Sequence, residues 1–307
     1  MYAEFYGFKE LPFALTPDPR YIYFTPSHTE VMANLHYGIE SGKGLVVVTG
    51  EVGTGKTTVL RWMMQRLDRT VMVAYLFNPR LSVTEFYQYV AGLMELQNWE
   101  TKPELLAALG HALESRHSRG LRTVLIIDEA QGLSPAVLEE IRLLSNFESD
   151  TSKQLQIVLT GQPELREVLN NPDLRQLKQR VALRCVIKPL PTVEETDRYI
   201  TARLLVSGAE RTNIFTSAAI DYIYRCTEGI PRNINNLCDN ALLAGFAAGD
   251  ETIDRDLIEE VAETLDMLPR SERRVPAQQK ELPAKIFSEA NRAELWAAGN
   301  GNGSDAN

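Results

Sequence analysis

An apolar segment that runs directly into a glycine-rich, cationic loop constrains this chain more than any other feature. Residues 45–49 are LVVVT, and the nine residues from Gly50 read GEVGTGKTT. This is the G-x-x-x-x-G-K-[ST] phosphate-loop pattern in its required strand–loop–helix context. Glycines let backbone N–H groups turn inward around a phosphate, and the next helix presents its positive N-terminus. The pattern predicts a nucleotide-binding loop over residues 50–58.

Two side chains of this loop have defined chemistry. Lys56 is expected to hold oxygens of the β- and γ-phosphates, and Thr57 to ligate Mg²⁺. The rest of the loop is expected to surround the nucleotide, through Gly50, Glu51, Val52, Gly53, Thr54, Gly55 and Thr58. The expected cofactors are therefore ATP and Mg²⁺.

Five short apolar segments alternate with helical patterns, at residues 45–49, 71–76, 123–127, 155–160 and 183–187. Nearly continuous hydrophobicity is typical of a parallel strand that is covered on both faces. Residues 82–85 and 101–104 fit capping boxes, and cap–proline pairs at 134–135 and 171–172 open further helices. Strands that alternate with helices predict a doubly wound, parallel α/β sheet.

After Pro189 the strand patterns stop. Helical patterns follow from Thr192 to near Gly208 and over residues 217–227, 231–248 and 255–265. The chain is thus predicted to divide into four parts: an extended N-terminal segment (1–26), an α/β nucleotide-binding domain (27–190), a helical domain (191–267) and a polar, disordered tail (268–307).

The third apolar segment ends in two acidic residues, within LIIDEAQ at 125–131. A carboxylate at the carboxyl end of a parallel strand lies where open α/β sheets bind ligands. Asp128 is expected to hold Mg²⁺ through its water shell. Glu129 is the candidate general base that orients the attacking water. An acidic pair after a strand is more often a helix cap, and only the phosphate loop favours the catalytic interpretation.

The fourth apolar segment ends in VLTGQP, at 158–163. A polar side chain at this tip, beside the strand of Asp128, could sense the γ-phosphate or the attacking water. Thr160 and Gln162 are both candidates for this role. A helix cap before Pro163 is the structural alternative.

Three cations lie within the seven residues LRQLKQR, 174–180. Leu174, Leu177 and Val181 share one helical face and are expected in the core. Arg180 then ends the helix, where it cannot easily reach its own phosphate loop but could reach that of a neighbouring subunit in a ring. An arginine supplied in trans stabilises charge on a transferring phosphoryl group. A solvated helix face is the alternative.

In GIPRNIN, at 229–235, an arginine occupies the first turn of a predicted helix. The helix dipole disfavours a cation there, and a phosphate partner would resolve the conflict. Arg232 is therefore the candidate for a γ-phosphate contact within the same chain. A surface arginine held by Asp239 or Glu228 is the alternative.

The bulk composition excludes several classes of protein. With 32 Lys+Arg against 41 Asp+Glu, the formal charge is −9, which weighs against non-specific nucleic-acid binding but leaves room for a local basic patch. The three cysteines lack metal-ligand spacing and are expected to be reduced thiols of a cytosolic protein. No signal peptide is apparent, and no apolar run approaches the ~20 residues that span a bilayer. The four histidines are expected to be structural or exposed.

Taken together, these motifs resemble those of the AAA+ ATPases of the general secretion pathway protein A (ExeA-type) family. The similarity covers about residues 1–266 and rests on FYGFKELPF, TPDPRYIYFTPSH, GEVGTGKTT, LIIDEAQGLS, LTGQPEL, LRQLKQR and GIPRNINNLCDNALL. It implies a P-loop NTPase (AAA+) fold, with a five-stranded parallel sheet in the order 5-1-4-3-2 and a C-terminal all-helical lid. It also implies nucleotide-dependent homo-oligomers, and it puts Pro12 and Phe13 near the adenine.

The resemblance further implies a role for each cation and polar tip residue noted above. Either Gln162 or Thr160 would be sensor 1, and Arg232 would be sensor 2. Arg180 would be the arginine finger, with Arg175 as the alternative. Many members of the family continue into a membrane span and a peptidoglycan-binding domain that have no counterpart in this sequence, so its length better matches the shorter ATPases of exosortase and exopolysaccharide gene clusters.

These inferences lead to one functional hypothesis and two alternatives. The hypothesis is an ATP-hydrolysing assembly motor or switch that serves an envelope secretion or exopolysaccharide export system. Such a protein would be cytoplasmic, and held at the inner membrane through its partners. The alternatives are a DNA-binding regulator of transposition on the same fold, and a scaffold that binds ATP with negligible turnover. A nucleic-acid partner is not favoured, because the cations of residues 174–184 are too few to require one.

Overall fold

The computed structural model describes residues 2–16, 18–77, 80–148 and 152–272. The residues up to Met267 form one compact unit. Of the tail that the sequence predicts to be disordered, residues 273–307 lie outside the described residues. No helix in the described part of the chain combines the length and apolar character that crossing a membrane requires.

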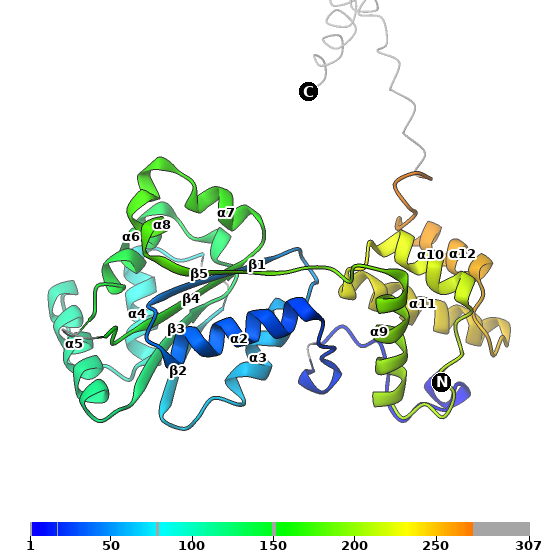
Figure 1. Ribbon diagram of the computed structural model, residues 1–307, viewed down its shortest axis with the longest axis horizontal. Helices are drawn as coiled ribbons and strands as arrows, with labels where there is room; N and C mark the ends of the chain where they lie inside the picture. Colours follow the sequence, from blue (N-terminus) through cyan, green and yellow to red (C-terminus); the bar gives the residue numbers. More distant parts are fainter. Residues whose placement is uncertain (1, 17, 78–79, 149–151, 273–307) are drawn as a thin grey trace, which may run out of the picture. The chain divides into compact units, whose positions relative to one another are not determined.

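A five-stranded, fully parallel sheet forms the first half of this unit (Figure 1). Its strands are β1 (Leu45–Gly50), β2 (Val71–Leu76), β3 (Arg122–Ile127), β4 (Gln156–Gly161) and β5 (Val181–Ile187). The strand order is β2-β3-β4-β1-β5, which confirms the predicted order of 5-1-4-3-2. Because the strands are parallel, the segments that follow β1, β3 and β4 all leave from one edge of the sheet.

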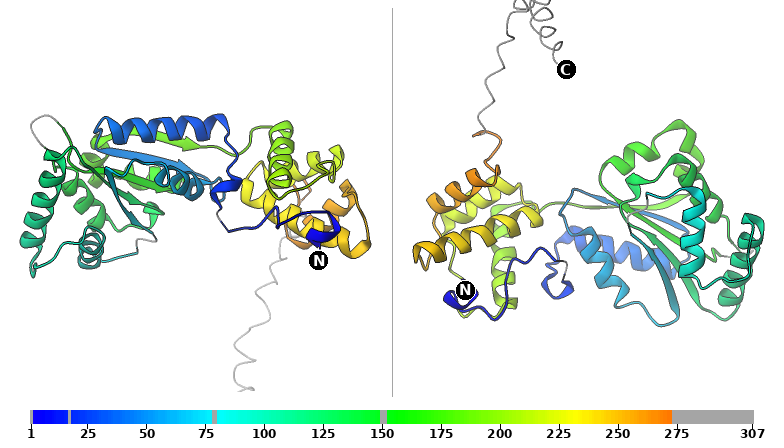
Figure 2. Two further views of the ribbon diagram at one scale, coloured as in Figure 1. Left: turned by 90° about the horizontal axis from the view of Figure 1, so that it is seen from below. Right: turned by 180° about the vertical axis from the view of Figure 1, so that it is seen from behind.

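Helices cover both faces of the sheet, as the apolar strands predict. Side chains alternate along each strand, so that Leu45 and Val47 enter one core and Val46 and Val48 the other. The helices on the face of Val46 are α2 (Pro26–Glu40) and α3 (Lys56–Met64). Those on the face of Val47 are α4 (Val83–Leu93), α5 (Lys102–Ser118), α6 (Pro135–Leu144), α7 (Glu164–Leu169) and α8 (Arg175–Arg180). Figure 2 shows these two layers on opposite sides of the sheet.

Local sequence signals account for where several helices begin. Ser82 caps α4 and Thr101 caps α5, each in a capping box with the glutamate three residues later. Ser134 caps α6, with proline at the first helical position. The pair at 171–172 instead opens a 3₁₀ turn, Pro172–Leu174, which leads into α8.

Four further helices follow β5: α9 (Val193–Val206), α10 (Ser217–Thr227), α11 (Pro231–Ala248) and α12 (Arg255–Thr264). Their bounds match the predicted helical region to within a few residues. Tyr222, Leu237, Leu242 and Ile258 are fully buried and form its core. Each of these side chains contributes about 1.5–3 kcal/mol through burial.

The N-terminal segment is less extended than predicted. It contains α1 (Tyr2–Phe5) and a 3₁₀ turn at Pro19–Tyr21, where Asp18 caps the first turn. Its beginning is fastened to the C-terminal helices (Figure 2). The Tyr2 hydroxyl donates to Asp239, the Tyr6 hydroxyl to the carbonyl of Asp250 at 2.8 Å, and the Lys9 N–H to the carbonyl of Ser207 at 2.8 Å.

Candidate nucleotide-binding site

The phosphate loop has the backbone that its glycines allow. Gly53 and Gly55 adopt φ of +84° and +97°, a region that residues with a Cβ rarely occupy. At Gly50, a Cβ would come within 2.7 Å of the Ile187 carbonyl oxygen on the neighbouring strand β5. α3 begins at Lys56, so its first N–H groups face the loop. This concave backbone fits a phosphate chain.

Lys56 lies buried under the loop. Its Nζ donates to the carbonyl oxygens of Gly50, at 2.8 Å, and Glu51, at 3.0 Å. Burial lowers the pKa of Lys56, and the nearby charges of Glu129 and Asp128 partly offset this effect by favouring the cation. An anionic phosphate would add to the charges that favour the protonated form.

Asp128 lies fully buried at the end of β3, where four groups donate to its carboxylate. Its Oδ2 accepts from Thr57 Oγ1 and from the Tyr75 hydroxyl, each at 2.9 Å. Its Oδ1 accepts from Thr160 Oγ1 and from the Glu129 N–H, the latter at 3.0 Å. Thr57 and Asp128, which the sequence predicts as a metal-binding pair, are thus in direct contact.

The oxygen atoms of Thr57 and Asp128 are suitable ligands for Mg²⁺. Hydroxyl and carboxylate oxygens are hard ligands, and Mg²⁺ usually takes one or two from the protein and the rest from water and phosphates. Among the described residues, no group of three or more His, Cys, Asp and Glu side chains converges as a metal site. Thr57 and Asp128 would therefore hold the ion only together with nucleotide phosphates.

Tyr75 is part of this site although no sequence motif indicated it. It occupies the second-last position of β2 and reaches Asp128 at the end of the neighbouring strand β3. Burial, and then the negative charge of Asp128, raise its pKa well above the usual range, so that it stays a hydrogen-bond donor.

Glu129 and Gln162 lie together beside this carboxylate. Glu129 has a left-handed backbone (φ +54°), and its Oε2 accepts from Gln162 Nε2 at 3.1 Å and from Gln131 Nε2 at 2.6 Å. The two sensor candidates therefore contact different acids: Thr160 donates to Asp128, and Gln162 donates to Glu129.

A cavity of about 410 Å³ lies over the phosphate loop. The predicted site residues that line it are Val52, Gly53, Thr54, Gly55, Lys56, Thr57, Thr58, Glu129 and Arg232. The predicted site residues outside its lining are Gly50, Glu51, Asp128, Thr160, Gln162, Arg175, Arg180, Pro12 and Phe13. Its volume and its mixture of apolar and charged groups suit a nucleotide-sized ligand.

Pro12 and Phe13, which the family resemblance puts near the adenine, do not line the cavity, and their place beside a bound adenine stays a prediction. Phe13 is fully buried, with its ring 6.2 Å from that of Phe215 in the helical region, and so does not face the cavity. Residues a few positions later line the cavity instead: Ala14, Leu15, Thr16, Asp18, Tyr21, Ile22 and Tyr23. The physical reason is that a phenylalanine between two regions gains more from the apolar core than from a half-open cavity.

Arg203 is a second residue that the motifs did not indicate. It lies on the buried face of α9 and lines the cavity. Its Nε donates to the Pro12 carbonyl at 2.6 Å and its Nη2 to the Ala14 carbonyl at 3.4 Å, and its guanidinium lies 4.6 Å from the Tyr21 ring centroid. The helical spacing of the buried residues 196, 199, 200, 203 and 204 is the signal that could have identified it.

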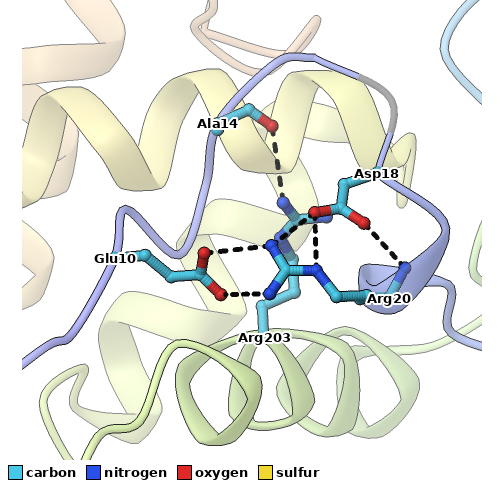
Figure 3. Close-up of polar contacts among 5 residues, drawn as sticks. All are labelled: Glu10, Ala14, Asp18, Arg20 and Arg203. Atoms are coloured by element: carbon cyan, nitrogen blue, oxygen red, sulfur yellow. Dashed lines mark hydrogen bonds and ion pairs between the residues drawn. The ribbon is translucent and has the colours of Figure 1, made fainter.

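Figure 3 shows how Arg203 and a second arginine hold the N-terminal segment. Arg20 forms ion pairs with Glu10, at 3.0 Å, and Asp18, at 2.6 Å, on the exposed side of the same loop. These bonds to Arg20 keep the pKa of both carboxyls below the usual range. The segment that lines the cavity is therefore held from the core side by Arg203 and from the solvent side by Arg20.

His28 contacts the backbone of the phosphate loop at Thr54. Its Nε2 lies 3.2 Å from the Thr54 carbonyl oxygen, which can only accept, so the proton is on Nε2. Its Nδ1 then accepts from the Thr25 hydroxyl at 2.6 Å. Burial lowers the pKa of His28, which favours this neutral tautomer.

The predicted cationic residues occupy two separate places. Arg232 lies in the first turn of α11, where its N–H donates to the Gly53 carbonyl at 3.2 Å and its side chain lines the cavity. Arg180 is the last residue of α8 and is half-buried, whereas Arg175 at the start of α8 is exposed. As predicted, Leu174 and Leu177 are in the core.

Comparisons with known proteins agree with this geometry. A family model described as an AAA domain matches residues 39–169. The fold is similar to that of Cdc6p from Pyrobaculum aerophilum, with a TM-score of 0.65 and 17% sequence identity over 84% of this chain and 70% of that chain. It is also similar to Drosophila ORC bound to DNA, with a TM-score of 0.60 and 17% identity over 83% of this chain and 66% of that chain. Identities this low show the fold alone. The strand order and phosphate loop define a P-loop NTPase of the AAA+ class, with a C-terminal helical lid region.

Comparison with one relative identifies the family to which the chain belongs within the AAA+ class. General secretion pathway protein A of Aeromonas hydrophila is 43% identical over 256 residues, which cover 82% of this chain and 46% of the relative. The chain thus spans about half the length of the relative that it matches. It belongs to the general secretion pathway protein A family of AAA+ ATPases.

Proposed function

We propose that this chain hydrolyses ATP, with Mg²⁺ as cofactor. The observation that carries the proposal is the direct hydrogen bond between Thr57 and Asp128, at 2.9 Å. It brings the helix after the phosphate loop and the carboxyl end of β3 together at the edge of the sheet where parallel α/β folds bind ligands. A scaffold that only binds Mg²⁺ and nucleotide would use Asp128, but it has no need of a second acid, Glu129, in the cavity lining.

The residues would divide the work as follows. The phosphate loop and Lys56 bind the phosphates of the substrate, and Arg232 approaches them from α11. Glu129, which lines the cavity, orients the attacking water and accepts its proton. Bound Mg²⁺ would neutralise charge on the β- and γ-phosphates. Residues 191–267 would act as a lid, because Arg232 and Arg203 belong to them and both line the cavity.

A pair of variants tests hydrolysis. Glu129→Gln keeps the shape of the side chain but removes the base, so we expect the hydrolysis rate to fall about 10²–10⁴-fold with nucleotide affinity retained. Lys56→Ala is expected to lose nucleotide binding itself. Hydrolysis by Glu129→Gln at the wild-type rate would remove Glu129 from this role.

We further propose that activity requires a homo-oligomer in which Arg180 reaches the nucleotide of a neighbouring subunit. Its place at the end of α8, outside the lining of its own cavity, supports this role. An equimolar mixture of Arg180→Ala and Lys56→Ala, each inactive alone, should then recover activity. A mixture that co-assembles but stays inactive would contradict the assignment, and Arg175→Ala would be tested next.

We propose that the work done by hydrolysis is the assembly or regulation of an envelope secretion or exopolysaccharide export system, with the chain cytoplasmic and held at the inner membrane by its partners. The identity of 43% to general secretion pathway protein A supports a secretion role. A chromosomal Lys56→Ala substitution in the native organism would separate the two systems. Loss of secreted protein with normal surface polysaccharide points to secretion, and the reverse result to polysaccharide export.

A further inference from the structure

Gln131 connects the tips of two neighbouring strands, although it has no role in the sequence analysis or in the proposed mechanism. Its Nε2 donates to Glu129 Oε2 at 2.6 Å, after the end of β3. Its Oε1 accepts from the Gln162 N–H at 3.1 Å, after the end of β4. Both contacts define the amide orientation, because a carboxylate can only accept and a backbone N–H can only donate.

A second amide completes the arrangement around Glu129. Gln162 Nε2 donates to the same Oε2 at 3.1 Å, so one carboxylate oxygen receives two N–H groups. No described residue donates to the other oxygen, Oε1. Glu129 lines the nucleotide cavity, whereas Gln131 and Gln162 do not. The two amides therefore hold the carboxylate through Oε2 alone and leave Oε1 without a donor among the described residues.

The glycine at position 161 leaves space for the Gln131 side chain. A Cβ at Gly161, the last residue of β4, would lie 2.6 Å from Gln131 Oε1 and 3.1 Å from Leu165 Cδ2. Any other residue at 161 would displace the glutamine side chain. Glu129 itself has φ +54°, which is uncommon for glutamate and persists only where the surrounding structure holds it.

We propose that Gln131 is a positioning residue. It holds the Glu129 carboxylate in the direction from which it orients the attacking water, and it couples that carboxylate to β4 through Gln162. The proposal rests on the proposed hydrolytic function. In this arrangement Gln162 acts through Glu129 and not by touching the γ-phosphate. The tip of β4 and the general base then move as one unit, because the Gln131 amide bonds to both.

Gln131→Met tests the role, because methionine keeps the length of the side chain and removes both hydrogen bonds. A hydrogen bond to a charged group typically contributes enough to change a rate about 10- to 100-fold, and we expect kcat to fall by this factor. The KM for ATP and the affinity for a fluorescent ADP analogue should stay unchanged. Gln88→Met, at an exposed position of α4, is the matched control and should be as active as wild type.

A double-mutant cycle separates positioning from a structural role. If Gln131 acts through the carboxylate, Gln131→Met should slow Glu129→Gln by less than about threefold in single-turnover hydrolysis. In the same way, Gly161→Ala should reduce kcat in the wild-type background and have little further effect beside Gln131→Ala, which removes the displaced side chain. Equal slowing by Gln131→Met in both backgrounds would overturn the proposal in favour of a structural role.

The remaining outcomes distinguish this inference from the proposed function. A normal kcat for Gln131→Met beside an inactive Glu129→Gln would refute the positioning role alone. A wild-type protein without turnover, or Glu129→Gln at the wild-type rate, would refute the proposed function and this inference with it.

Discussion

Gly53 provides a test of how closely the lid region approaches the phosphate loop. A Cβ added at Gly53 would lie 2.5 Å from the Cβ of Arg232 and 3.2 Å from Cγ2 of Ile230. Neither atom is the end of a flexible side chain, so the N-terminus of α11 would have to move away from the loop. That movement breaks the hydrogen bond from the Arg232 N–H to the Gly53 carbonyl, now 3.2 Å long.

The magnitude follows from three contributions to the free energy of unfolding. A Cβ at φ +84° costs about 1–2 kcal/mol in backbone strain. Overpacking costs about 1–3 kcal/mol, and the lost hydrogen bond about 0.5–1.5 kcal/mol if the helix moves instead. The last two are alternatives, so Gly53→Ala should be destabilising by about 1.5–5 kcal/mol in the absence of nucleotide.

Gly120→Ala is the matched control, since Gly120 has φ +72° and its added Cβ would meet nothing within 4 Å. It should cost the strain alone. The extra cost over the control is about 0.5–3 kcal/mol, so at about 2–4 °C per kcal/mol for a unit of this size, Gly53→Ala should melt roughly 1–12 °C below the control in thermal unfolding. Arg232→Gly removes the obstructing Cβ, and combining it with Gly53→Ala should recover part of the difference. Equal melting temperatures for the two alanine variants would refute the close approach.

Three further predictions concern residues that the motifs did not indicate. Tyr75→Phe removes one of the hydrogen-bond donors that orient Asp128. We expect nucleotide binding by this variant to need several-fold more Mg²⁺, whereas binding in EDTA stays unchanged. Tyr89→Phe, at an exposed position, should change neither property. His28 has a pKa lowered by burial, so the unfolded chain takes up the proton first as the pH falls through about 6.5, and stability should decrease there by up to ~1.4 kcal/mol per pH unit. His28→Asn should flatten this dependence in melting curves at pH 5.5–8, and an unchanged slope would contradict the buried neutral form. Arg203→Met leaves buried carbonyls unsatisfied and should cost about 1–3 kcal/mol while speeding proteolysis of residues 8–16, and an unchanged cleavage rate would contradict its role in fastening that segment.

The elements that the sequence predicted well depend on local or strictly periodic signals. The phosphate loop follows from residue types that must be adjacent, and the strand order was implied by the family resemblance that these motifs support. Capping boxes at Ser82 and Thr101 are correct because both partners lie within one turn. The assignments of Arg180, Arg232 and the catalytic role of Glu129 remain predictions.

The residues that the sequence did not reveal act across the sheet or between distant segments. Tyr75 reaches Asp128 from another strand, and Gln131 needs the tip of β4 beside it. Neither pairing has a fixed spacing in sequence, so no pattern along the chain indicates it. Phe13 is expected near the nucleotide because of its place in a family motif, and the family motif alone does not show that its ring packs against Phe215 and is fully buried.

The bond between Tyr2 and Asp239 joins residues 237 positions apart, and it has a consequence for how the chain is made. At a synthesis rate of about 5–20 residues per second, α1 emerges from the ribosome roughly 10–50 s before the helix on which it packs. During this time its aromatic side chains have no partner, while the intervening α/β region can already fold. The nascent chain therefore exposes the aromatic side chains of α1, which a chaperone could bind until α11 is complete.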